Sequence, residues 1–216
     1  MYKKITLELE VTDTKLIAVS KTKPESAILE MYEQGQRIFG ENRVQEMVTK
    51  HANLPKDIEW HAIGHLQTNK VKQIAPFISL IHSIDSLRLL VEVNKEARKN
   101  DRVIDVLLQF HIADEETKYG FELVEVSTML NKEVLEDMEN VNIVGVMGMA
   151  TFTEDEEQVR SEFIYLKKIF DELQEKFFSE KADFKEISMG MSGDYRIAVE
   201  EGSTMVRIGS LLFGKR

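Results

Sequence analysis

The stretch that decides the fold is LIAVSKTKPESA, residues 16–27. Its apolar run, residues 16–19, has the length of a buried strand. Pro24 predicts the start of a helix, because proline is favoured in the first helical turn. Lys21 therefore lies at a strand end, the edge where parallel α/β proteins bind ligands. Partial burial and the like charge of Lys23 favour the neutral, nucleophilic amine. The alternative, an ordinary solvated lysine, is the better interpretation of this stretch taken alone.

The same strand-then-helix pattern continues along the chain. Further strands are expected at residues 37–39, 58–63, 80–84, 103–112, 143–149, 184–189 and 204–208. Helices are expected at residues 24–34, 44–51, 68–74, 87–99, 121–131, 133–138, 154–178 and 194–201. Strands that alternate with helices form a parallel sheet covered by those helices.

This alternation predicts an α/β fold, a (β/α)8 TIM barrel, with residues 1–216 as one domain. An open doubly wound sheet is the alternative, but its Gly-x-Gly-x-x-Gly turn is missing after the first strand. Residues 1–14 leave two interpretations open. Alternation of Ile5, Leu7, Leu9 and Val11 indicates a strand, whereas the interspersed Glu and Lys also suit a frayed helix.

The composition restricts the class of protein. Hydrophobic residues make up 43% of the chain, which is enough for a sizeable core. No run of eighteen apolar residues is present, so no membrane span is expected, and the start MYKKITLELE lacks the apolar region of a signal peptide. The absence of cysteine excludes disulfides and zinc–thiolate sites. These features predict a cytoplasmic protein, and the net charge of −10 disfavours nucleic-acid binding.

A closed barrel would gather the strand ends at one rim and place the eighth strand beside the first. Arg207, Gly209 and Ser210 are therefore expected close to Lys21. Two segments at this rim have the character of phosphate-binding loops: SMGMSG at residues 188–193, which precedes a short helix, and the Gly-Ser pair after the last strand. Either loop alone is more simply an ordinary turn. Two such loops beside a strand-end lysine favour a phosphorylated aldehyde, with pyridoxal 5′-phosphate as the candidate.

Other polar residues at the rim have two interpretations each. Arg207 shares a strand face with Met205, and its guanidinium would keep a pyridine nitrogen unprotonated; a surface salt bridge is the alternative. Asn42 is expected either to contact the cofactor or to cap the next helix. His61 and His65 are four residues apart, but no third ligand has a suitable spacing, so no metal site is expected.

Six motifs together carry a family resemblance. They are AVSKTKP (18–24), FGENRVQE (39–46), WHAIGHLQTNK (60–70), MGMA (147–150), SMGMSGD (188–194) and GSTMVRIGSLLFG (202–214). In this order they resemble the YggS/PROSC family of pyridoxal phosphate homeostasis proteins, and the resemblance spans residues 16–214. Two positions depart from the family pattern, because Ser210 stands where threonine is common and Gly193 where an acidic residue is frequent.

The resemblance implies a fold-type III barrel, similar to the N-terminal domain of alanine racemase. It implies that Lys21 forms the Schiff base and that Arg207 faces the pyridine nitrogen. The residues implied to surround the rest of the cofactor are Asn42 beside the ring and Ser192, Gly209 and Ser210 at the phosphate. Further candidates at this rim are Lys23, His65, Met147, Ser188, Met189 and Gly190. No catalytic residue is assigned.

The resemblance also implies a function, the binding and buffering of pyridoxal 5′-phosphate in vitamin B6 homeostasis, with apo-enzymes that use this cofactor as partners. The alternative is an amino-acid racemase, which needs a proton carrier on each face of the substrate α-carbon. In alanine racemase the second carrier is a tyrosine from a domain after the barrel, and this chain ends at Arg216. The carrier is therefore the expected function. A barrel that binds another phosphorylated ligand without a covalent bond is a third interpretation.

Overall fold

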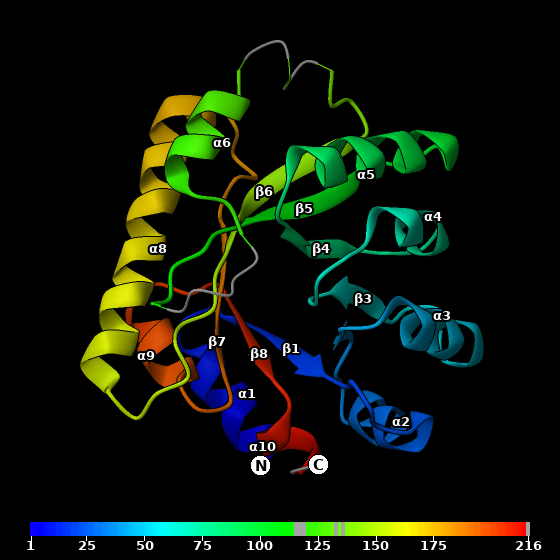
Figure 1. The fold of residues 1–216 in the computed structure, drawn as a ribbon. Coiled ribbons are helices and arrows are strands. Elements are labelled where there is room, and N and C mark those ends of the chain that lie inside the picture. Colours follow the sequence, from blue (N-terminus) through cyan, green and yellow to red (C-terminus); the bar gives the residue numbers. More distant parts are fainter. Residues whose placement is uncertain (115–119, 132–133, 135–136, 215–216) are drawn as a thin grey trace.

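The computed structural model describes residues 1–114, 120–131, 134 and 137–214. Eight parallel strands form a closed barrel in chain order, with helices around its outside (Figure 1). The strands are β1 (Lys15–Val19), β2 (Ile38–Glu41), β3 (Glu59–Ala62), β4 (Leu80–Ile84), β5 (Ile104–Gln109), β6 (Val141–Met147), β7 (Glu186–Met191) and β8 (Met205–Ile208). This topology confirms the predicted (β/α)8 barrel and excludes an open sheet.

The helices that the structure describes include those predicted between the strands, and in addition α1 before β1 and the short α10 after β8, which was not predicted. They are α1 (Tyr2–Glu10), α2 (Glu25–Glu33), α3 (Val44–Asn53), α4 (Val71–Ile74) after the 3-10 turn η1 (Thr68–Lys70), α5 (Leu87–Lys99), α6 (Leu123–Met129), α8 (Glu156–Phe177), α9 (Tyr195–Glu200) and α10 (Ser210–Phe213). The helix predicted at residues 133–138 falls largely outside the described residues. Pro24 is the N-cap of α2, and the Ser86 hydroxyl accepts a hydrogen bond from the Leu89 N–H at the start of α5.

The strands have an inner and an outer face. Apolar side chains that point inward fill the barrel and form one cluster: Ile17, Leu80, Leu107, Val144, Met147 and Met205. Alternate residues such as Ala18 and Phe39 point outward and pack under the helices. β1 pairs with β8, and Ile17 lies opposite Arg207 in that pairing. The closure of the barrel therefore joins the first and last parts of the chain.

The N-terminal segment is a helix, so the strand interpretation of residues 1–14 is wrong. Ile5 and Leu9, four residues apart, are 1% and 2% exposed, whereas Leu7 and Val11 are 63% and 85% exposed. The buried pair packs in a cluster with Val206 and other residues of β1, β8 and α9. The period of four, rather than two, is the one that matches burial.

β7 begins and ends two residues later than predicted. Phe184 belongs to the preceding loop, where its ring stacks on the rings of Phe170 and Phe178. Gly190 and Met191, which the prediction placed after the strand, therefore lie within it together with Ser188 and Met189.

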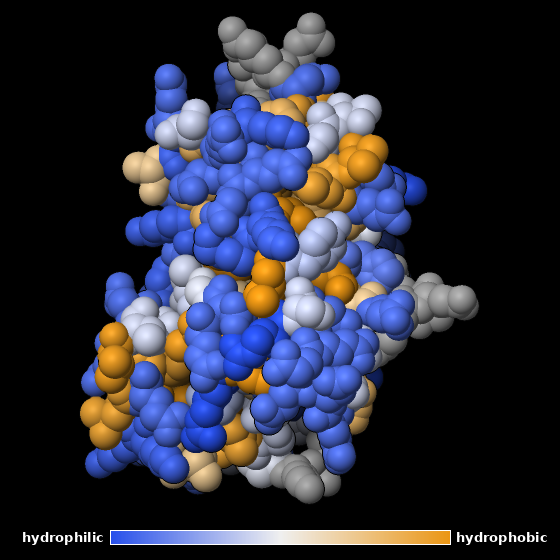
Figure 2. Space-filling view, turned by 90° about the vertical axis from the view of Figure 1, so that its left-hand side faces the viewer, coloured by the Kyte–Doolittle hydropathy of each residue, from blue (hydrophilic) through white to orange (hydrophobic). Residues whose placement is uncertain are grey.

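The surface is largely polar. On the face drawn in Figure 2 hydrophilic side chains cover most of the area, and apolar side chains form small separate groups. Among the described residues, no helix combines the length and the hydrophobicity that a membrane span requires.

Candidate functional site

A cavity of about 740 Å³ opens at the carboxyl ends of the strands. Seven of the predicted site residues line it: Lys21, Lys23, Asn42, Ser192, Arg207, Gly209 and Ser210. They come from the loops after β1, β2, β7 and β8, and from β8 itself. Barrel closure therefore brings together residues that are almost two hundred positions apart, as the topology predicted.

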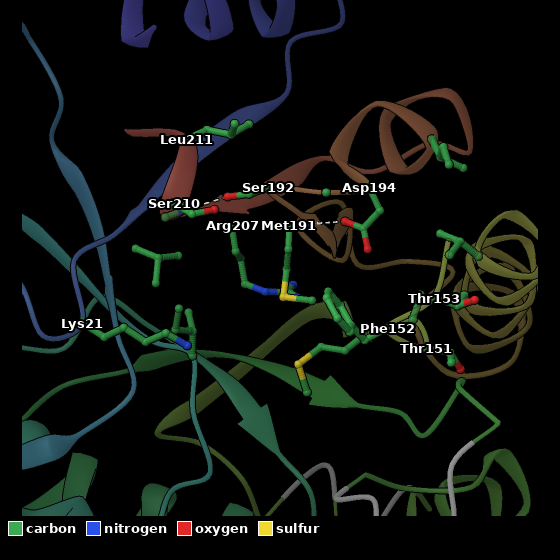
Figure 3. Close-up of a pocket in the computed structure, with 18 of the residues that line it drawn as sticks. Lys21, Thr151, Phe152, Thr153, Met191, Ser192, Asp194, Arg207, Ser210 and Leu211 are labelled. Carbon is green, nitrogen blue, oxygen red and sulfur yellow. Dashed lines mark hydrogen bonds between the residues drawn. The ribbon is translucent and has the colours of Figure 1, made fainter. Parts of the chain in front are cut away.

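Two lysines follow β1, and their surroundings differ. Lys21 is half-buried and its amine points into the cavity, on the side of Arg207 and Met191 (Figure 3). Lys23 donates hydrogen bonds from its ammonium to the carbonyl oxygens of Phe213 (2.9 Å) and Gly214 (3.2 Å). The side chain of Lys23 is therefore held against the end of the chain, whereas that of Lys21 reaches the cavity.

Arg207 is a buried cation in the wall of the cavity. Only 4% of its surface is exposed. Its guanidinium donates to the Ser188 hydroxyl oxygen (2.6 Å) and to the carbonyl oxygen of Gly148 (3.0 Å). Burial lowers the pKa of Arg207 to about 10, and the nearby Asp194 carboxylate opposes that shift. The guanidinium is thus positively charged at neutral pH, and its burial excludes the surface position that the salt-bridge alternative assumed.

Behind Arg207 a chain of hydrogen bonds runs through the barrel interior. The Ser188 Oγ lies 2.8 Å from Nδ1 of His82, and Nε2 of His82 lies 2.9 Å from Nδ1 of His61. Because the guanidinium only donates, Ser188 donates its hydroxyl proton to His82, which in turn donates from Nε2 to His61. Burial lowers the pKa of His61 to about 3 and the pKa of His82 well below its usual value. Both imidazoles are therefore neutral at physiological pH.

The loops after β7 and β8 supply hydrogen-bond donors at one side of the cavity. The Gly209 N–H donates to the Ser192 hydroxyl (3.2 Å), which ties the two loops together. The Met191 N–H donates to the Asp194 carboxylate (2.5 Å). Ser210 begins α10, and the first N–H groups of a helix have no acceptor within that helix. The Leu212 and Phe213 N–H groups donate to the Gly209 carbonyl oxygen, which leaves the Ser210 and Leu211 N–H groups at the start of α10 as the ones that can take an anionic tail.

Asp194 lies in the same wall and introduces negative charge. Burial raises the pKa of its carboxyl group, and the Met191 N–H and the Arg207 guanidinium act in the opposite direction. The Arg207 guanidinium and the Asp194 carboxylate therefore attract each other electrostatically in the lining of the cavity.

Five predicted residues do not line this cavity. Ser188 is fully buried between Arg207 and His82, and Met189 belongs to the outer core. Gly190 packs against α9, Met147 lies in the inner cluster, and the His65 ring bonds the Asp85 carboxylate at 2.9 Å. Ser188, Met189 and Gly190 all lie within β7, before the loop that lines the cavity.

Two features of the site were not predicted. His82 lies in the middle of the strand sequence LIHSI, where the apolar neighbours gave no sign of its hydrogen bonds to Ser188 and His61. Thr151 and Phe152 form a wall of the cavity in the loop between β6 and α8. The position of that loop, after a strand end, is the signal that could have identified it. Phe152 is 98% exposed at this rim.

Comparison with known proteins places the chain in a family. The profile for "Alanine racemase, N-terminal domain" matches residues 3–216. A pyridoxal phosphate homeostasis protein of Aquifex aeolicus is 43% identical over 203 residues, which cover 94% of this chain and 87% of the relative. The human pyridoxal phosphate homeostasis protein is 37% identical over 219 residues, covering 97% and 79% of the two chains.

Solved structures agree with these sequence matches. PipY of Synechococcus elongatus, solved with pyridoxal 5′-phosphate bound, is 36% identical and superposes with a TM-score of 0.85, covering 94% of this chain and 93% of PipY. An alanine racemase of Clostridium difficile has a TM-score of 0.68 at 16% identity, covering 94% and 53%, which shows a shared fold alone. The chain therefore belongs to the alanine racemase N-terminal domain family and, within it, to the pyridoxal phosphate homeostasis proteins.

Proposed function

We propose that this protein binds pyridoxal 5′-phosphate in the cavity at the strand ends, bonds it covalently through Lys21, and stores it for vitamin B6 homeostasis. One observation carries the proposal. The Lys21 amine enters a cavity whose wall contains the buried Arg207 guanidinium and whose rim contains the Ser192 and Ser210 loops. The relatives named as homeostasis proteins, and PipY with the cofactor bound, support it.

The donor set of the cavity fits the proposed cofactor. When bound, pyridoxal 5′-phosphate supplies an aldehyde that condenses with a primary amine and releases water. Lys21 is half-buried in the lining of the cavity and supplies the primary amine for this reaction. The hydroxyl groups of Ser192 and Ser210, and the N–H groups at the start of α10, suit a phosphate.

Arg207 suits the ring of the cofactor. A guanidinium donates hydrogen bonds but accepts none, so facing a pyridine nitrogen it would hold that nitrogen unprotonated. Arg207 keeps its charge because its pKa, at about 10, lies well above neutral. An unprotonated pyridine withdraws electrons weakly. Arg207 therefore favours the storage of an intact cofactor over the chemistry of a bound amino acid. Asn42, at the end of β2, lies in the same lining and is proposed to contact the ring.

The test is a labelling experiment on the purified protein. Incubation with pyridoxal 5′-phosphate is expected to give an absorbance band of the bound cofactor, and borohydride is expected to fix it on Lys21, as found by peptide mapping. Lys21→Ala is expected to remove the label. Lys23→Ala is the matched control and is expected to keep it, because the Lys23 ammonium is held by Phe213 and Gly214. A label on Lys23, or none, would contradict the proposal.

We further propose that the loaded protein acts in the cytoplasm and delivers its cofactor to apo-enzymes. Mixing the loaded protein with an apo-enzyme in the presence of a scavenger of free cofactor is expected to restore the activity of that enzyme. A racemase assay across amino acids is the counter-test. Turnover in the wild type that Lys21→Ala abolishes would replace storage by catalysis as the function.

A further inference from the structure

The loop that carries Lys21 contains a strained backbone position directly after it. Thr22 has φ of +64°, in the left-handed region. Among the described residues, the other non-glycine positions with positive φ are Asp13 and Asp101, and aspartate tolerates this region. Threonine is β-branched and does not. The conformation at Thr22 therefore needs support from its surroundings.

Two side chains of α3 provide that support. The Glu46 carboxylate accepts a hydrogen bond from the Thr22 N–H at 2.7 Å. The Lys50 ammonium, one turn further along α3, donates to the same Glu46 oxygen at 2.6 Å. Lys50 also donates to the carbonyl oxygen of Ser20 at 2.9 Å, which accepts in addition from the Lys23 N–H at 3.0 Å. Both sides of Lys21 are thus held from the same helix.

The charges in this cluster are buried. Lys50 is 4% exposed and donates at 2.7 Å to Glu41, which is 1% exposed. Burial raises the pKa of Glu41, and its Oε2 has no hydrogen-bond partner among the described residues. Buried ion pairs of this kind seldom add stability compared with apolar residues of similar size. A role in positioning explains why such a group lies beside this loop.

We propose that Glu46 and Lys50 are positioning residues for Lys21: they hold residues 20–23 in a left-handed turn that directs the Lys21 amine into the cavity. The inference rests on the proposed function, because it assigns to the cluster the placement of the amine that bonds the cofactor. Glu46 acts through the Thr22 N–H and does not line the cavity itself.

The experiment measures the rate of bond formation between Lys21 and pyridoxal 5′-phosphate by absorbance, over a range of pH, at fixed protein concentration. Glu46→Ala is expected to slow this reaction about tenfold, the effect of losing one hydrogen bond to a charged acceptor. Glu46→Gln keeps an acceptor for the Thr22 N–H and is expected to retain most of the rate. Thr22→Asn in the Glu46→Ala background is expected to restore the rate, because asparagine adopts the left-handed region readily.

The matched control is Glu172→Ala, which removes the corresponding pair with Lys176, also four residues apart, from α8. It is expected to leave the rate unchanged, and circular dichroism verifies the fold of each variant. A Glu46→Ala protein that reacts as fast as the wild type, or one that Thr22→Asn does not rescue, would overturn the inference.

A second readout separates this result from failure of the proposed function. Acetic anhydride acetylates the lysines of the cofactor-free protein without any need for cofactor binding. Mass spectrometry then gives the extent of acetylation at Lys21 relative to Lys23. Glu46→Ala is expected to change this ratio, and Thr22→Asn to return it to the wild-type value. If the wild type forms no bond with the cofactor, the proposed function is wrong, and an unchanged acetylation ratio would then refute the positioning role as well.

Discussion

The buried histidine pair predicts a specific loss of stability in acid. His61 is neutral in the folded protein because burial lowers its pKa from 6.5 to about 3. In the unfolded chain the same imidazole binds a proton below pH 6.5. The unfolded state therefore binds more protons than the folded state as the pH falls, and the free energy of unfolding decreases with it.

The size of the effect follows from the pKa of His61 in the two states. Between pH 6.5 and pH 3 the loss is about 1.4 kcal/mol per pH unit for this one group. At pH 5 it amounts to about 2 kcal/mol relative to pH 7.5. Burial shifts the pKa of His82 in the same direction, so His82 adds to the loss.

The measurement is urea-induced unfolding at pH 7.5 and pH 5 of the wild type and of His61→Gln. The glutamine offers an amide oxygen to the His82 N–H and does not titrate. The difference in unfolding free energy between the two pH values is expected to be smaller in the variant by about 2 kcal/mol. Equal differences in the two proteins would show that His61 is not held neutral by the fold and would refute the reasoning.

Two further predictions concern the site and the barrel. Arg207→Met is expected to weaken binding of pyridoxal 5′-phosphate about tenfold to a hundredfold in an absorbance titration, because a hydrogen bond from a charged donor is lost. The control is Arg196→Met, which changes an exposed arginine paired with Glu8 and is expected to leave the affinity unchanged. Gly145→Ala is expected to lower the free energy of unfolding by at least about 3 kcal/mol, because a Cβ at Gly145 would overlap the backbone of Glu186. Gly193→Ala, where a Cβ meets no atom within 4 Å, is expected to unfold at the wild-type urea concentration.

Much of the fold was predictable because local patterns and global packing agree. The run LIHSI and the helix after it have the bounds, 80–84 and 87–99, that the sequence pattern predicted. The proximity of Arg207 to Lys21 could be predicted from the closure of the barrel alone, because closure places the last strand beside the first whatever the side chains contact. That residues 1–216 form one domain stays a prediction.

The remaining differences have physical causes that a linear pattern does not contain. In the first helix Ile5, Leu7 and Leu9 are all apolar, and only the packing of α1 on β8 decides which of them is buried. Phe184 packs in an aromatic stack before β7, and that strand ends two residues later than predicted. Ser188 is buried against His82 in the barrel interior and not at the rim. Hydrogen bonds between side chains far apart in the chain, such as those of His82, leave no periodic signal.

The pairing of β1 with β8 has a consequence for the biosynthesis of the protein. Lys21 is synthesised long before Arg207 and the Ser210 loop, and Ile17 meets Arg207 only when the ring of strands closes. The packing of α1 also depends on the presence of β8, because Ile5 and Leu9 pack on Val206 and Ile208. A chain that has not yet reached β8 therefore lacks the Arg207 and Ser210 side of the pocket, and the cavity forms only after β8 has joined β1.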